Sequence, residues 1–193
     1  DLERRNDMQR DIETRDVRFK VMNEFLRLRS RGSDQNLLSR WVAILGDGFT
    51  CTLPQVDPNK AADPLTRVLH GPEECFRDAC EFEAFLHDIF EGSNTLAITY
   101  QCDRLSFMMD GIKTMMTWTL QVAPTEPDFD GQKFSLKGHM RASFIPSSNK
   151  LSQVELMFDT QNIKCQIQSI VQSRQQSFPI SSDPISAQPI SNG

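Results

Sequence analysis

Two different periods of apolar residues divide the chain into a helical first half and a sheet-forming second half. Up to about residue 91 the apolar residues recur every three to four positions, which is the spacing of one face of an α-helix. Over residues 95–167 they alternate with polar residues or form runs rich in threonine and aromatic side chains, which is typical of strands. The pattern predicts an α+β domain with about three helices before an antiparallel sheet.

The first predicted helix is long, because residues 1–31 contain no proline or glycine and are dense in arginine, aspartate and glutamate. Heptad spacing along it allows a weak coiled-coil seam made of Met8, Ile12, Phe19, Met22 and Leu26. Alternatively, only residues 17–28 form a firm helix, whose core-facing stripe is Val21, Phe25 and Leu28. In either case we expect residues 1–16 to be a charged lead-in to the domain.

Capping residues predict two further helices. Asp34 is a suitable N-cap for a short helix that contains Trp41 and ends at the glycines of residues 46–48. A short strand over residues 49–53 and a surface loop over residues 54–66 follow. The third helix begins at Gly71, where Pro72 fits the first helical position, and it runs to about residue 91.

Two hairpins are predicted in the second half. Asp110-Gly111 separates two strand-like runs and favours a tight turn. Residues 134–145 alternate strictly between apolar and polar side chains and are followed by a turn. Placing Ile145 opposite Leu151 sets four cross-strand pairs: Arg141 with Glu155, Lys137 with Asp159, Met140 with Leu156, and Ala142 with Val154. Opposite charges on one face and apolar pairs on the other both favour this register.

The end of the chain is polar and repetitive. Pro-Ile-Ser occurs three times after residue 178. Such a segment cannot bury enough apolar surface to offset its ordering entropy, so we expect residues 169–193 to be a disordered tail. The globular domain is then predicted over residues 17–168.

Composition and charge narrow the function classes. A length of 193 residues fits a single domain, and a net charge of -5 argues against DNA binding by the whole surface. No apolar run is long enough to cross a membrane, so no membrane contact is expected. Five cysteines without a CxxC pair are expected to be reduced thiols, which favours an intracellular location in cytoplasm or nucleus.

A family resemblance is carried by the order and spacing of several residues over about residues 17–165. They are Trp41 before Phe49 and Pro54, the Gly71-Pro72-Glu73-Glu74 helix entry, Asp110-Gly111 before Trp118, and a closing hairpin that ends in Asp159. This order resembles the nuclear transport factor two-like superfamily, especially its SnoaL-like branch. The resemblance implies a curved antiparallel sheet wrapped around about three helices as a cone. The cone mouth holds an apolar ligand, an active site or only packing, and the outer sheet face often makes a dimer.

The catalytic residues of this superfamily do not carry over to the sequence. The ketosteroid-isomerase-like members use a tyrosine on the first helix, whereas Tyr100, the only tyrosine, lies on a predicted strand. The dehydratase-like members use a histidine with a carboxylate. Here His70 falls in a predicted loop, His87 on a helix, and His139 on the charged face of a strand. No phosphate loop, zinc-ligand set or nucleophile elbow is present either, so neither a cofactor nor a metal is expected.

One carboxylate and a set of aromatic residues remain as candidates for a site. Asp103 lies across from Trp118 if the hairpin pairs without a bulge, and burial there would raise its pKa and suit it to proton transfer. A bulge would instead turn Asp103 outward. The candidate ligand-binding residues either line a cavity or fill the core: Trp41, Phe49, Phe82, Phe85, Asp103, Trp118, Met140 and Phe158.

The leading hypothesis is therefore a noncatalytic SnoaL-like module. It is expected to form a homodimer, to hold a small apolar ligand in its cone, and to serve a larger regulatory protein. The charged first helix also resembles the end of a basic leucine zipper in stramenopile transcription factors, which implies DNA contact only through an upstream segment. The alternative is an isomerase, hydratase or cyclase that uses a cone carboxylate such as Asp103.

Overall fold

The computed structural model describes residues 2–32, 34–55, 66–129 and 131–177. Within them it confirms the α+β class, with four α-helices, seven strands and three short 3-10 helices. The helices are α1 (Leu2–Arg29), η1 (Gln35–Leu37), α2 (Leu38–Ile44), α3 (Gly71–Ile89), η2 (Arg104–Ser106), η3 (Pro127–Phe129) and α4 (Thr160–Ser177). The strands are β1 (Leu45–Pro54), β2 (Thr66–His70), β3 (Leu96–Cys102), β4 (Met108–Asp110), β5 (Lys113–Pro124), β6 (Phe134–Phe144) and β7 (Leu151–Phe158).

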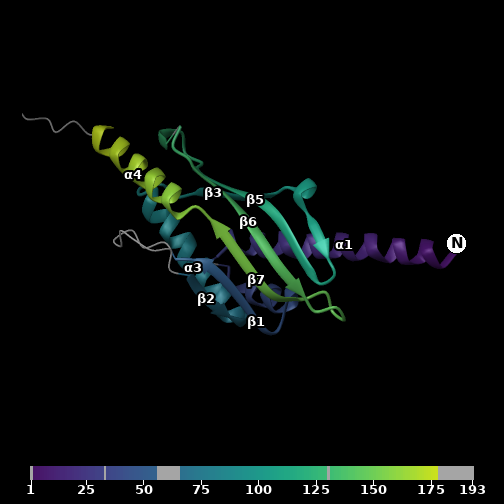
Figure 1. Cartoon of the computed structure of the whole chain (residues 1–193). Helices are drawn as coiled ribbons and strands as arrows, with labels where there is room; N and C mark the ends of the chain where they lie inside the picture. The colour runs from purple at the N-terminus through teal and green to yellow at the C-terminus, as the bar shows by residue number, and fades with distance from the viewer. Residues whose placement is uncertain (1, 33, 56–65, 130, 178–193) are drawn as a thin grey trace, which may run out of the picture.

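The strands form one curved sheet in the order β2-β1-β7-β6-β5-β3, and β4 pairs with β5 beside β3. All neighbours are antiparallel except β1 and β7, which run parallel. The sheet is therefore mixed, not wholly antiparallel as predicted. β7 reaches β1 only after the strands β3 to β6, and it runs beside β1 in the same direction. Figure 1 shows α1 and α3 behind the sheet, where they cover its concave, apolar face.

The register predicted for the closing hairpin is confirmed along most of its length. Met140 lies opposite Leu156, Arg141 opposite Glu155, and Ala142 opposite Val154. Two predicted pairs are wrong. A bulge between Ser143 and Phe144 places Phe144, not Ile145, opposite Leu151, and the ladder ends at Gly138 and Phe158, before Lys137 and Asp159. Asp159 lies beyond β7, where its carboxylate accepts hydrogen bonds from the backbone N–H groups of Gln161 and Asn162 at 2.9 and 3.1 Å and caps α4.

Helix α1 is continuous, so the prediction that it spans the whole first segment is confirmed. Its two halves differ in burial: Met22 and Leu26 are fully buried in the core, whereas Met8 and Ile12 are 66% and 51% exposed. The amino-terminal half projects away from the body of the domain (Figure 1). The heptad seam thus becomes the core-facing stripe in the second half and an exposed stripe in the first.

Three segments differ from their predicted structure. Thr66, expected as the last residue of a loop, and His70, also expected in a loop, are the two ends of the edge strand β2. Residues 160–167, expected as strand, and residues 169–177, expected as tail, form α4. The rest of the predicted tail, residues 178–193, lies outside the described residues. No described helix is long and apolar enough to span a membrane.

Candidate functional site

A cavity of about 260 Å³ lies inside the cone, between the concave face of the sheet and helices α3 and α4. Most of its wall is apolar, and much of that wall is aromatic. The lining residues include Leu53, Phe82, Phe85, Tyr100, Trp118, Leu120, Phe134, Leu136, Leu156, Phe158 and Ile163. At about 30 Å³ for each water molecule, the volume corresponds to roughly nine waters, which fits a small organic molecule.

The aromatic wall depends on a row of residues across the sheet. Trp118 on β5 lies opposite Gly138 on β6, and Gly138 in turn lies opposite Phe158 on β7. A Cβ added at Gly138 would come within 2.3 Å of the Trp118 ring, so only glycine leaves room for the indole to lie over β6. Trp118 can then contact both Tyr100, at 5.5 Å between ring centroids, and Phe158, at 6.1 Å.

One end of the cavity is polar and charged. Arg29 at the end of α1 donates a hydrogen bond from Nη1 to Oδ2 of Asp78 on α3, at 2.6 Å, and both side chains are about 95% buried or more. The second carboxylate oxygen of Asp78, Oδ1, pairs with Arg67 of β2. Arg67 also lies 3.5 Å from the exposed carboxylate of Glu81. Both oxygens of the buried carboxylate are therefore engaged by arginines.

Tyr100 joins this polar end to the aromatic wall. Burial raises the pKa of its phenol, and the charge of Arg29 and a hydrogen bond with Arg29 oppose that rise. Arg29 also lies over the ring of Phe82, with 5.8 Å between the guanidinium carbon and the ring centroid. The guanidinium is thus fixed on two sides while it faces the cavity.

The structure divides the predicted ligand-binding residues into two groups. Phe82, Phe85, Trp118 and Phe158 all line the cavity. Trp41, Phe49 and Met140 are at most 1% exposed and belong to the solid core, outside the cavity lining. Trp41 and Phe49 both pack on the ring of Phe25 in α1, at 5.2 and 6.1 Å between centroids, which explains why they do not reach the cavity.

Asp103, the predicted catalytic candidate, lies on the surface outside the cavity. Cys102, not Asp103, is opposite Trp118. The reason is a bulge: η2 interrupts the strand between β3 and β4, and the Asp103 carboxylate caps η2 by accepting a hydrogen bond from Leu105 N–H at 2.9 Å. The tight turn also shifts by one residue, because Asp110 pairs with Lys113 and Gly111, with a φ of 57°, takes the first loop position.

Sequence reasoning missed the charged residues of the site. Arg29 and Asp78 occur in arginine-rich and acidic helical segments where most such side chains are solvated, so no local pattern singles them out. Asp78 does follow Cys75 and precede Ala79 and Phe82 on the buried stripe of α3, and a carboxylate within such a stripe is a usable signal. Tyr100 does not match the helical tyrosine of the ketosteroid-isomerase-like members, but it lies on β3 and lines the cavity.

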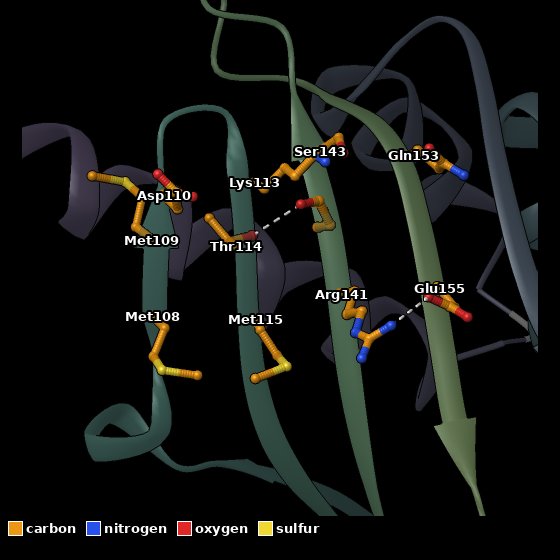
Figure 2. Close-up of a pocket in the computed structure, with 11 residues that line it drawn as sticks. Met108, Met109, Asp110, Lys113, Thr114, Met115, Arg141, Ser143, Gln153 and Glu155 are labelled. Atoms are coloured by element: carbon orange, nitrogen blue, oxygen red, sulfur yellow. Dashed lines mark hydrogen bonds and ion pairs between the residues drawn. The ribbon is translucent and has the colours of Figure 1, made fainter.

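A second, shallow hollow of about 570 Å³ lies on the outer, convex side of the sheet over β4 to β7. Figure 2 shows the side chains of Met108 and Met115 lying side by side there, next to Arg141 and Glu155 on the neighbouring strands. Arg141 and Glu155 are 3.7 Å apart, so the predicted charge pair on this face is confirmed. The face therefore combines an exposed apolar area with paired charges.

A curved sheet that closes with helices around an apolar cavity is the α+β architecture that the sequence predicted. No protein-family model matches the sequence, and no curated protein matches it.

Solved structures share this architecture at low sequence identity. A Rhodopseudomonas palustris protein with a provisional isomerase name is 12% identical, with a TM-score of 0.53 over 77% of this chain and 96% of that one. PrhC from Penicillium brasilianum NBRC 6234 is 13% identical, with a TM-score of 0.50 over 84% of this chain and 92% of that one. A nuclear transport factor two-like protein of unknown function from Burkholderia pseudomallei K96243 is 18% identical, with a TM-score of 0.44 and coverage of 75% and 95%. At such identities the likeness extends to the fold alone.

Proposed function

We propose that this domain is a noncatalytic module that binds a small, mainly apolar molecule in its cone. The observation that carries the proposal is the cavity of about 260 Å³, whose wall is built from aromatic and aliphatic side chains. Concave, mostly apolar sites with a few converging polar groups are the usual binding sites for small molecules. Trp118 reaches this wall because Gly138, opposite it, has no Cβ.

The absence of catalysis is proposed from the state of the carboxylates that line the cavity. Asp78 is the buried one, and arginines engage both of its oxygens. A general base must have a free lone pair within reach of the proton it removes, and paired arginines stabilise the ionised form and hold its lone pairs. Glu81 has a side chain that is 59% exposed and lies at the mouth, where water competes for it.

A neutral fluorescent probe tests the binding proposal. N-phenyl-1-naphthylamine should bind the full chain with increased fluorescence. Leu136→Trp, which adds volume to a 5% exposed wall residue, should weaken that binding at least about tenfold. Val42→Trp, at a 48% exposed valine on α2 outside the cavity lining, is the matched control and should leave binding unchanged.

Leu156→Phe adds less volume to the same wall and is the second cavity variant if Leu136→Trp fails to fold. Unchanged probe affinity in both folded cavity variants would refute binding in the cone.

The rival function, an isomerase, hydratase or cyclase that uses a cone carboxylate, is tested with a panel of enolisable ketones. Turnover by the unmodified chain that disappears in Asp78→Asn would overturn the noncatalytic proposal.

A second proposal is that the domain forms a homodimer through the outer sheet face. A two-fold interface needs a self-complementary surface, and the outer hollow offers exposed Met108 with positive Lys113 and Arg141 beside negative Asp110 and Glu155. Light scattering should give twice the chain mass. Met108→Glu should reduce it to the chain mass, whereas Leu105→Glu, at a 96% exposed leucine outside the hollow, should not. A chain mass for the unmodified protein would contradict this proposal.

We also propose that the projecting half of α1 connects the domain to a larger regulatory protein of the transcription-factor type. The exposed stripe of Met8 and Ile12 and the high charge of this half support the proposal. The residues encoded immediately before Asp1 test it. A stretch rich in asparagine and arginine is expected there, and a different sequence would remove the basis for DNA contact.

A further inference from the structure

The polar end of the cone cavity has more hydrogen-bond donors than acceptors. Arg29 is 4% exposed, and its Nε has no hydrogen-bond partner among the described residues. Trp118 is 3% exposed, and its indole Nε1 also lacks a partner there. Both residues line the cavity. A buried donor without an acceptor costs free energy comparable to a lost hydrogen bond, so two such donors on the wall of one cavity indicate where a ligand supplies oxygen atoms.

The neighbouring groups do not supply the missing acceptors. Both oxygens of Asp78 are engaged, one by Nη1 of Arg29 and the other by Arg67. Tyr100 lines the cavity together with Arg29, and its phenol O–H is a further donor. Tyr100 also lies in ring contact with Trp118, at 5.5 Å, so the donors of Arg29, Tyr100 and Trp118 follow one another along the cavity wall.

The charges at this end are paired, and the free hydrogen-bonding capacity is that of donors. Arg29 and Arg67, with side chains 5% and 40% exposed, both pair with the buried carboxylate of Asp78. Arg67 also lies 3.5 Å from the carboxylate of Glu81, which is 59% exposed, so two positive and two negative charges meet here. Because both oxygens of Asp78 are engaged while Nε of Arg29 has no partner among the described residues, a head group with acceptor oxygens complements this end of the cavity.

We propose that the ligand is a small apolar acid, whose carboxylate accepts hydrogen bonds from Arg29 and Tyr100 and whose apolar body lies against Trp118 and Phe158. This inference rests on the proposed ligand-binding function and names the chemical class of the ligand. Guanidinium and carboxylate groups match in geometry, and charge-assisted hydrogen bonds are about twice as strong as neutral ones. The cavity volume of about 260 Å³ leaves room for one ring or a short chain beyond the acid group.

Two probes with the same body and different head groups test the ligand class. Isothermal titration calorimetry on the full chain at pH 7 compares 3-phenylpropionate with 3-phenylpropanamide. The acid should bind at least about tenfold more tightly than the amide, which is the factor expected from the stronger charge-assisted hydrogen bonds. Arg29→Gln should remove this preference, whereas Arg40→Gln, at an arginine with a 41% exposed side chain that pairs with Glu24, should keep it.

Tyr100→Phe provides a variant that keeps the buried Arg29–Asp78 pair intact, in case Arg29→Gln fails to fold. It should weaken binding of the acid severalfold and leave the fold unchanged by circular dichroism. Equal affinity for acid and amide would overturn the acid preference while leaving the ligand-binding function in place. If neither probe binds, both the preference and the function that it rests on are contradicted.

Discussion

The carboxylate of Glu126 is held by three hydrogen bonds from the loop that follows α3. Its side chain accepts hydrogen bonds from Ser93 Oγ at 2.8 Å and from the backbone N–H groups of Asn94 and Thr95 at 2.7 and 3.0 Å. The hydrogen bond from Ser93, followed by those from the backbone, lowers the pKa of Glu126 from 4.5 to about 2. The residue joins the loop after α3 to the end of β5.

The lowered pKa of Glu126 predicts the sign of a pH effect. A carboxyl whose pKa is lower in the folded state stabilises the fold above its unfolded pKa, and this stabilisation is lost as the pH falls through the folded pKa. The free energies of unfolding of the unmodified chain and of Glu126→Gln, measured with urea, should therefore differ at pH 7 and converge between about pH 4.5 and pH 2. A difference that does not change with pH would contradict this account. Glu3→Gln, at an exposed position on α1, is the control.

Gly138 is the residue on which the shape of the cavity depends. Its missing Cβ leaves the space that the Trp118 indole and the Met157 carbonyl occupy. Gly138→Ala should cost about 1–3 kcal/mol of unfolding free energy, as overpacking of a core does. In a double-mutant cycle with Trp118→Phe, the smaller ring should relieve the part of that cost that comes from the indole, whereas the part that comes from the Met157 carbonyl remains. Additive effects in urea unfolding would show that the two residues do not compete for space.

At the scale of elements, α4 is the part of the cone that closes the cavity. Ile163 lines the cavity, and Gln166 bonds to both backbone groups of Ser135 on β6. Ile170 is 7% exposed, whereas its neighbour Val171 is 40% exposed. The helix therefore presents one apolar face to the domain.

Substitutions of these two neighbours test the role of α4. Ile170→Ala should lower the unfolding free energy by about 2–4 kcal/mol, because it leaves a cavity between α4 and the body. Val171→Ala, on the exposed face, should change it by no more than about 0.5 kcal/mol. Equal effects of the two substitutions in urea unfolding would mean that α4 does not pack as the structure has it.

The sequence did not predict α4, which was expected as strand followed by tail. Its apolar residues Ile163, Ile167 and Ile170 have helical spacing, and Asp159 is a suitable N-cap, but β-branched isoleucines after a strong hairpin favour strand. The closing hairpin itself was predictable, because both of its faces agree on one register. The parallel contact between β1 and β7 was not, because about a hundred residues separate the two strands and no local pattern encodes it.

For the molecule as a whole, the sequence predicted the apolar half of the site better than the polar half. Phe82, Phe85, Trp118 and Phe158 belong to stripes that face the interior, so periodicity finds them. Periodicity does not separate them from Trp41 and Phe49, because cavity wall and solid core have the same pattern. Arg29 and Asp78 meet across 49 positions of sequence, and such a contact follows only from the tertiary structure.

The whole account depends on an open cavity beside Trp118 and a filled core around Trp41, and the two indole N–H groups report on these two environments. Both are buried without a hydrogen-bond partner among the described residues, and only Trp118 lines the cavity. Titration of the nitrogen-15-labelled chain with 3-phenylpropionate should shift the Trp118 indole resonance progressively and leave that of Trp41 in place. Trp118→Phe assigns the two signals. No shift of either resonance at saturating probe, or equal shifts of both, would contradict a ligand site in the cone.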